Sequence, residues 1–439
     1  MSFIADKQTL EDLNLLGKFK QHSIFSLFNK VNTSGAEKLL NEMFQNPLTE
    51  PGAINKRSAI LKYFQSKQLS FPFANEQFSM VDNYLSGSGG RHYLTALIVL
   101  GKKKLLGTIV RDEEYKKTQS SLQQTIALLN QCKTFISQFL NDDDHPFYNE
   151  VLAVKNILDD PKLEWLAIEQ NNQLSLTKMA RYDNLLRHKM HAALTIVIDT
   201  FYLLDLYISV ANLAQAKDFN FAQARPKEDN LFTATALRHP GIGKAVANPV
   251  SFHQHSNMIF LTGANMAGKS TFMKAFGINV YLAHMGFPVA AKGMEFSVKD
   301  GIYTSINVPD NLNMGYSHFY AEVLRVKNVA EEVSSGRSLV IIFDELFKGT
   351  NVKDAYDATL AVTAAFSEYA NCLFIISTHI IEAGEVLKER NNIQMLYLPT
   401  IMNGNIPQYT YKLQPGISSD RHGMMIIENE GILELLDTN

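Results

Sequence analysis

The chain has 439 residues, of which 46% are hydrophobic and 19% are charged, and its formal net charge is −3. These values are ordinary for a soluble globular protein of two or three domains. They exclude a surface that is basic throughout, although a local basic groove stays compatible with them. The two cysteines, Cys132 and Cys372, lie in no CxxC pattern, so we expect neither a disulfide framework nor a zinc site. The first residues contain no apolar h-region of a signal peptide, and we expect a cytoplasmic protein.

Apolar residues recur at helical spacing through the first half of the chain. The predicted helices lie at residues 35–44, 54–64 and 122–140, with one or two long packed helices at residues 178–213. The apolar stretch Ala192–Ala214 is interrupted by Asp199 and Asp205. Because carboxylates near a bilayer centre are costly, we interpret this stretch as a buried helix and expect no membrane contact. An all-helical domain is therefore predicted over residues 1–235.

Short apolar runs of strand length replace this pattern after residue 235. They lie at residues 258–262, 339–343, 373–377 and 395–398, and helical stretches separate several of them. Buried apolar strands that alternate with helices are typical of an α/β domain with a largely parallel sheet. The predicted fold class is therefore mixed, with the all-α domain followed by an α/β domain over residues 236–439.

A phosphate-binding motif follows the first of these runs. The sequence GANMAGKS fits the pattern GxxxxGK[ST] and lies between a predicted strand and a predicted helix, which is the context of a P-loop. In a P-loop, backbone N–H groups bind phosphate oxygens, the lysine reaches the β- and γ-phosphates, and the hydroxyl binds Mg²⁺. The sequence therefore predicts a P-loop NTPase domain with ATP and Mg²⁺ as cofactors. The predicted ATP-binding residues are Gly263, Ala264, Asn265, Met266, Ala267, Gly268, Lys269, Ser270 and Thr271.

Two further strand ends carry side chains suited to ATP hydrolysis. Asp344 and Glu345 follow one apolar run. We assign Asp344 to Mg²⁺ together with Ser270, and Glu345 to general-base activation of water. His379 follows another run and could contact the γ-phosphate or position the attacking water, so the predicted catalytic set is Glu345, His379 and Lys269. The alternatives are that a carboxylate caps the next helix and that the histidine is structural.

Four segments together resemble the ATPase domain of the MutS DNA mismatch-repair family, an ABC-type P-loop ATPase. They are TGANMAGKST at Thr262–Thr271, SHFYAE at Ser317–Glu322, DELFKGTN at Asp344–Asn351 and STH at Ser377–His379. The resemblance covers about residues 238–423, and residues 35–60 more weakly resemble the start of the MutS helical core and lever. It implies a homodimer that hydrolyses ATP slowly, in which Ser317 of each subunit reaches the nucleotide held by the other.

The chain also departs from the family pattern. Tyr316 and His318 flank the signature serine where Arg and Thr are usual, and Lys348 and Asn351 replace Arg and Ser. No aromatic residue lies at residues 245–248, where one is expected to stack on adenine. These departures favour an altered hydrolysis rate or altered subunit coupling rather than a loss of ATP binding.

The sequence leaves no room for the mismatch-binding and connector domains of MutS, so we expect a truncated MutS-like protein. The resemblance favours an ATP-dependent DNA-binding protein of repair or recombination, which recognises DNA structures rather than mismatches and acts with repair proteins. The alternative is a nucleotide-gated protein scaffold without nucleic-acid contact, which the net charge of −3 favours. A basic lining on the helical domain would distinguish the two functions, and so would a steep salt dependence of binding.

Overall fold

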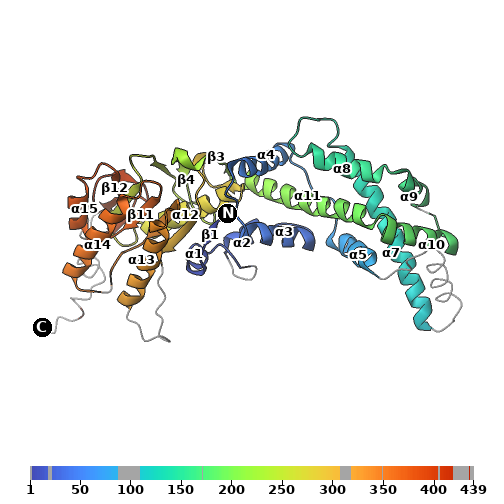
Figure 1. Cartoon of the computed structure of the whole chain (residues 1–439), viewed down its shortest axis with the longest axis horizontal. Helices are drawn as coiled ribbons and strands as arrows, with labels where there is room; N and C mark the ends of the chain where they lie inside the picture. The colour runs from blue at the N-terminus through green and yellow to red at the C-terminus, as the bar shows by residue number, and fades with distance from the viewer. Residues whose placement is uncertain are drawn as a thin grey trace. The chain divides into compact units, whose positions relative to one another are not determined.

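The computed structural model describes residues 2–17, 22–87, 109–170, 172–306, 318–348, 350–403, 406–418 and Leu435. It combines helices with several sheets (Figure 1), as the mixed fold class predicts. The chain forms two compact units. The sheet unit consists of residues 1–28, 43–58 and 214–439, and the helical unit consists of residues 29–42 and 59–213.

A seven-stranded sheet forms the centre of the sheet unit. Its strands pair in parallel, except that β15 pairs antiparallel with β12. In spatial order the strands are β1 (Ile4–Ala5), β9 (Gly301–Ser305), β10 (Leu339–Phe343), β11 (Leu373–Ser377), β6 (Met258–Gly263), β12 (Ile393–Leu398) and β15 (Gln414–Pro415). The four apolar runs predicted as strands are β6, β10, β11 and β12. All residues of β10 and β11 are buried, as expected for parallel strands that are covered on both faces.

Helices pack on the two faces of this sheet. On one face Phe343 and Phe374 contact Phe366 of α14, with ring centroids 5.9 and 5.4 Å apart. On the other face α12 approaches closely at Gly277, where an added Cβ would lie 3.0 Å from the side chain of Ile342. The helical elements of the sheet unit are α1 (Lys7–Asp12), α2 (Ile24–Phe28), η3 (Lys227–Asp229), α12 (Lys269–His284), α13 (His318–Ser334), α14 (Val352–Ser367) and α15 (Ile381–Leu387).

Smaller sheets complete the sheet unit, and the four-stranded one packs on α12. Phe232 of β4 contacts Phe276 of α12, with ring centroids 4.9 Å apart, so the apolar face of this sheet packs on α12. The four-stranded sheet has the order β3 (Gln223–Arg225), β8 (Gly293–Ser297), β4 (Phe232–Leu237) and β5 (Asn248–Phe252). The two-stranded sheets pair β2 (Asn220–Phe221) with β7 (Pro288–Val289), and β13 (Thr400–Asn403) with β14 (Ile406–Tyr409).

The first residues of the chain belong to the sheet unit, so the compact units divide the chain differently from the predicted boundary at residue 235. The physical reason is backbone pairing, because β1 adds to the edge of the central sheet beside β9. Side chains reinforce it. The carboxylate of Asp12 accepts hydrogen bonds from Thr304 Oγ1 at 2.7 Å and from the backbone N–H of Ile306 at 2.9 Å. Asp6 forms an ion pair with Arg325 of α13.

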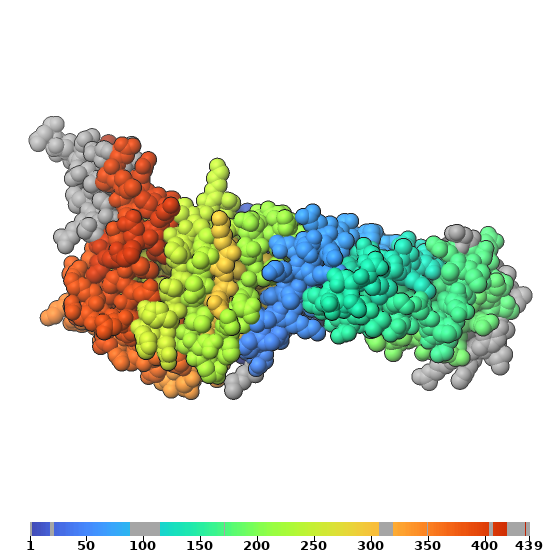
Figure 2. Space-filling model, turned by 90° about the horizontal axis from the view of Figure 1, so that it is seen from above, coloured from blue at the N-terminus to red at the C-terminus, as the bar shows by residue number. Residues whose placement is uncertain are grey.

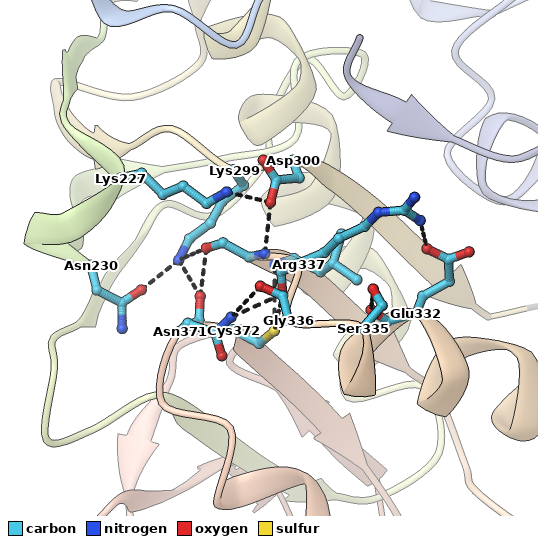
Figure 3. A network of polar contacts seen from close by, with 12 residues as sticks. Lys227, Asn230, Lys299, Asp300, Glu332, Ser335, Gly336, Arg337, Asn371 and Cys372 are labelled. Carbon is cyan, nitrogen blue, oxygen red and sulfur yellow. Dashed lines mark hydrogen bonds and ion pairs between the residues drawn. The ribbon is translucent and has the colours of Figure 1, made fainter. Parts of the chain in front are cut away.

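A buried polar network connects the loops that enter β9, β10 and β11 (Figure 3). Lys299 is 2% exposed, and its Nζ donates to Asn230 Oδ1 at 2.5 Å, Ser338 Oγ at 3.1 Å and Asn371 O at 2.9 Å. Burial lowers the pKa of Lys299 to about 8. Beside it, Lys227 donates to Asp300 at 2.5 Å. The network satisfies polar groups at the amino edge of the sheet, because buried donors and acceptors without partners are costly.

The described residues of the helical unit contain no strand. Its core is rich in buried phenylalanines, including Phe64, Phe78, Phe147 and Phe201. The predicted helices at residues 35–44 and 54–64 lie within α3 and α4, and residues 178–213 form α10, a π-helical segment and α11. The elements are α3 (Ser34–Gln45), α4 (Pro51–Lys67), α5 (Asn75–Ser86), α7 (Ile109–Ser137), α8 (Tyr148–Leu158), η1 (Pro161–Leu163), α9 (Trp165–Glu169), α10 (Leu176–Asn184), η2 (Leu185–Lys189) and α11 (His191–Lys217), of which α3, α4 and α11 contribute residues to both units.

Helix α11 is the one helix in the described part of the chain that is long and apolar enough to cross a membrane. In the folded chain, 72% of its most apolar window is buried. Asp205 on this helix is fully buried and accepts hydrogen bonds from the backbone N–H groups of Asn32 and Thr33, at 2.9 and 2.7 Å. The carboxylate within the apolar stretch therefore binds backbone donors inside the protein, which is the pattern of a core helix.

Candidate nucleotide-binding site

The P-loop connects the end of β6 to the start of α12. Gly263, Met266 and Gly268 have φ angles of 142°, 65° and 101°, a region that glycine enters most easily. An added Cβ at Gly263 would also lie 3.1 Å from Leu398 O, so a close backbone approach requires a glycine there. Gly268 is the N-cap of α12 and has no side chain to cap the helix, which leaves the first N–H groups of a 16-residue helix available to an anion.

Lys269 and Ser270 occupy the first positions of α12. Lys269 is 5% exposed, and its Nζ donates to Gly263 O at 2.8 Å and to Ala264 O at 3.2 Å, so it lies over the loop. Desolvation by burial lowers the pKa of Lys269, and the carboxylates of Asp344 and Glu345 oppose this effect. A cation is therefore held where the loop N–H groups would hold phosphate.

Ser270 and Asp344 meet from two different elements. Ser270 Oγ donates to Asp344 Oδ2 at 2.5 Å, and Ser377 Oγ at the end of β11 donates to Asp344 Oδ1. A hydroxyl and a carboxylate are oxygen ligands of the kind that Mg²⁺ prefers, so these residues fit the ion. In the described part of the chain no group of three or more His, Cys, Asp or Glu side chains could hold a metal. A bound Mg²⁺ would therefore take its other ligands from phosphate and water.

Glu345 and His379 lie together because β10 and β11 are neighbouring parallel strands, with Phe343 opposite Ile376. His379 Nε2 is 2.5 Å from Glu345 Oε1. This hydrogen bond is the main cause that lowers the pKa of Glu345 to about 2, against the effect of burial, and the charge of Lys348 at 3.7 Å contributes. Glu345 is therefore ionised at neutral pH, which is the form required of a general base.

A cavity of about 280 Å³ lies beside the P-loop. Gly268, Thr271 and Phe272 form one wall, and the aromatic rings of His239 and Tyr411 also line it. The segment of Tyr411 is held in place by Asn248, whose Nδ2 donates to Tyr411 O at 2.9 Å. In Figure 2 the yellow-green residues around β4 and β5 adjoin the red-orange residues of the C-terminal part of the chain on the surface of this unit.

Comparison with known proteins shows which family this part of the chain resembles. Residues 259–435 match the family model of MutS domain V. The chain is 30% identical over 239 residues to the DNA mismatch repair protein MutS of Leuconostoc mesenteroides, an alignment that covers 52% of this chain and 28% of that protein. It is 30% identical over 197 residues to the protein of the same name from Lactococcus lactis, covering 45% and 23%.

Over residues 259–435 the chain is similar to the MutS family. Members of this family are ATPases connected with DNA mismatch repair, which supports ATP binding and an ATPase activity at that general level. The aligned part spans only about a quarter of the length of these two MutS proteins. Their whole activity, substrates and partners are therefore not carried over with the family.

The structure accounts for one of the departures from the MutS pattern, at Asn351. Asn351 stands where MutS usually has Ser, and its side chain accepts a hydrogen bond from Asp354 N at 2.9 Å as the N-cap of α14. Serine and asparagine are both good N-caps, so the exchange preserves the start of the helix. Ser317, predicted to reach the partner subunit's nucleotide, lies outside the described residues, as does Tyr316.

The structure brings together the other predicted site residues, whose roles stay predictions. In the P-loop, Ala267 is fully buried, whereas Met266 is 77% exposed and Asn265 is also exposed. Sequence reasoning missed the roles of Ser377 and Tyr411. The hydroxyl of Ser377 could have been found from its place at the end of a strand beside that of Asp344. No sequence motif marks Tyr411, because only the fold brings it to the P-loop.

Proposed function

We propose that this protein binds ATP with Mg²⁺, hydrolyses it slowly at composite sites of a homodimer, and couples this cycle to DNA binding in repair or recombination. The observation that carries the proposal is the arrangement around the P-loop. Ser270 lies at hydrogen-bonding distance from Asp344, and Glu345 lies at hydrogen-bonding distance from His379. Two pairs from three separate chain segments thus converge beside a phosphate-binding loop.

Each residue has a distinct task in this proposal. The N–H groups at the start of α12 and the Lys269 ammonium bind the β- and γ-phosphates. Ser270 and Asp344 hold Mg²⁺, which when bound neutralises charge on the phosphates. The ionised Glu345 accepts a proton from the water that attacks the γ-phosphate, and His379 fixes the orientation of the Glu345 carboxylate.

The cavity beside the P-loop suits the base of the nucleotide. The aromatic residue usual near residues 245–248 is absent, but Tyr411 and His239 line the same cavity from other segments. Stacking on an aromatic ring is an interaction that every base can make. We therefore assign adenine to this cavity, with Tyr411 in the place of the missing aromatic residue.

The homodimer follows from the resemblance of Ser317–Glu322 to the MutS signature segment. In this arrangement ATP would favour a closed dimer by binding it more tightly than the open one, and the helical domain would act as a lever. Light scattering after size exclusion, with and without ATP, measures this directly. A monomer under both conditions would contradict the composite site.

One hollow of the helical unit supports DNA binding over the protein-scaffold alternative. It has a volume of about 470 Å³, and its lining includes the cations Lys162, Arg181 and Lys189 with the indole of Trp165 and no carboxylate. A different hollow of the same unit is lined instead by Glu42, Asp82 and Asp199 among other residues. Positive charge beside an aromatic ring is typical of nucleic-acid contacts. This hollow is locally positive although the whole chain has a net charge of −3.

The first experiment is an ATPase assay of the purified protein with no DNA and with duplex, mismatched and branched DNA, beside the variant Glu345→Ala. We expect basal hydrolysis and DNA stimulation, both abolished by Glu345→Ala. Hydrolysis that Glu345→Ala abolishes but that no nucleic acid changes would support the protein-scaffold alternative. Hydrolysis that persists in Glu345→Ala would contradict the assigned base.

A further inference from the structure

A buried glutamate of α13 binds the turn that carries the candidate general base. Glu322 is 3% exposed, and its Oε1 accepts a hydrogen bond of 2.6 Å from the backbone N–H of Phe347. A carboxylate acceptor makes this bond charge-assisted and therefore stronger than a bond between neutral groups. Phe347 lies two positions after Glu345, in the turn that follows β10.

The backbone of this turn needs support. Glu345 and Phe347 have φ angles of 56° and 61°, in the left-handed region that bulky residues rarely occupy. Such a conformation persists only where the surrounding structure holds it. The turn is held from the β11 side, where the N–H of Glu345 donates to Ser377 O at 3.1 Å, and from the α13 side, where Glu322 binds Phe347.

Helix α13 is itself anchored close to this contact. Arg325, one turn after Glu322, donates from Nε to Thr304 O at 3.1 Å, and its guanidinium pairs with Asp6. The ring of Phe319 on the same helix contacts Phe347, with centroids 6.2 Å apart. The helix therefore contacts the Glu345 turn at both a backbone group and a side chain, so a displacement of α13 must move that turn or break the bond to Glu322.

We propose that Glu322 is a positioning residue that couples α13 to Glu345. It acts through the backbone of Phe347, and it sets where the Glu345 carboxylate lies relative to His379 and to the attacking water. The proposal rests on the proposed role of Glu345 as general base. It predicts that the reach of the residue 322 side chain to Phe347 N controls the rate of hydrolysis and leaves ATP affinity unchanged.

Two conservative variants of the full chain separate the effect of the length of the residue 322 side chain from the effect of its negative charge. Glu322→Gln keeps an oxygen at the same distance and removes the charge, whereas Glu322→Asp keeps the charge and withdraws the oxygen by one methylene. We expect Glu322→Asp to lower kcat about tenfold, as the loss of one charge-assisted hydrogen bond implies, and Glu322→Gln to stay within about threefold of wild type. Fluorescent ATP titration should give an unchanged Kd for both. Glu331→Ala, an exposed position of the same helix, is the matched control.

Each other outcome overturns the inference in a distinct way. Parallel losses of kcat, ATP affinity and melting temperature in both variants would show that Glu322 only stabilises the packing of α13. If Glu322→Asp leaves kcat unchanged while Glu345→Ala is inactive, the proposed coupling through Glu322 is contradicted and the proposed function still stands. An active Glu345→Ala variant would overturn both together.

Discussion

Glu345 combines two features that a free glutamate lacks. Its backbone is in the left-handed region, and its carboxylate forms a hydrogen bond with His379 that lowers its pKa to about 2. A carboxylate with so low a pKa is a weak proton acceptor while it is hydrogen-bonded to His379. His379 therefore both orients the carboxylate and lowers its basicity. At this scale, the chemistry of the site depends on a pair of side chains rather than on the acid alone.

Replacing His379 by alanine should move the acid limb of the pH–rate profile of ATP hydrolysis to higher pH. Without its main hydrogen bond, the pKa of Glu345 should rise from about 2 toward its ordinary value of 4.5. A depressed carboxylate pKa keeps the group ionised above it, so wild type should lose no Glu345 function between about pH 7 and pH 5, whereas His379→Ala should lose rate below about pH 5. The pH dependence of single-turnover ATP hydrolysis measures this.

Lys348→Met is the matched control, because Lys348 lies farther from Glu345, at 3.7 Å, and contributes less to its pKa. Its acid limb should move less than that of His379→Ala. Identical acid limbs in wild type and His379→Ala would show that the histidine does not set the protonation of Glu345.

The sequence predicts some of these residues and not others for a physical reason. Lys269, Asp344 and His379 were found because each stands at a fixed place beside an apolar run, and parallel strands bring their carboxyl ends to one edge of a sheet. Tyr411 and Glu322 contribute through contacts between segments far apart in the chain. No local pattern records such contacts, so only the folded structure identifies them.

At the scale of elements, burial decides which strands a sequence can predict. Strands β6 and β10 are apolar runs of five or six residues, which periodicity detects. Strands β1 and β15 have two residues each, and they are strands only because a neighbouring strand pairs with them. The same limit applies to the polar network at the amino edge of the sheet, in which Lys299 is buried without a distinguishing motif.

Lys299 should make the stability of the sheet unit depend on pH. Its folded pKa of about 8 lies below the ordinary value of 10.5, so the folded state carries a desolvation penalty for the charged form at low pH. That penalty is fully present below about pH 8 and disappears as pH rises toward 10.5. Over this range the free energy of unfolding of wild type should rise by about 3 kcal/mol relative to that of a protein without this group. Thermal unfolding of wild type and Lys299→Met between about pH 7 and pH 10 measures the effect.

The expected result is a difference in melting temperature that changes in favour of wild type across this pH range. The comparison with Lys299→Met removes the contribution of the other titrating groups, since both proteins share them. A difference that stays constant with pH would show that Lys299 does not titrate in this window.

At the scale of the whole molecule, the two units are built from interleaved parts of the chain. The sheet unit includes residues 1–28 and 43–58, which belong to the part of the chain predicted to be all-helical. Residues near the N-terminus join it because β1 pairs with β9 and Asp12 binds Ile306, just after β9. Periodicity assigns helix or strand along the chain, but it carries no information on which unit a helix joins. A boundary drawn where the pattern changes, at residue 235, therefore divides the sequence by element type and not by packing.

The basic hollow of the helical unit gives the last prediction, on what the molecule binds. If Arg181 and Lys189 contact nucleic-acid phosphates, the double variant Arg181→Ala, Lys189→Ala should bind DNA more weakly and with a shallower salt dependence. Each lost phosphate contact lowers the slope of log K against log salt by about 0.7–0.9, so the slope should fall by about 1.4–1.8. Anisotropy of a labelled oligonucleotide between about 50 and 200 mM salt measures it.

Lys155→Ala is the control for this measurement, because Lys155 lies on the same unit but is paired with Asp159 at 2.8 Å. Its slope should match that of wild type, and the basal ATPase rate should be the same in all three proteins because the hollow and the P-loop belong to different units. Binding with equal slopes in wild type and double variant would move the DNA contact to another surface. No binding at any salt concentration, with ATPase activity intact, would instead favour the nucleotide-gated scaffold over a DNA-binding protein.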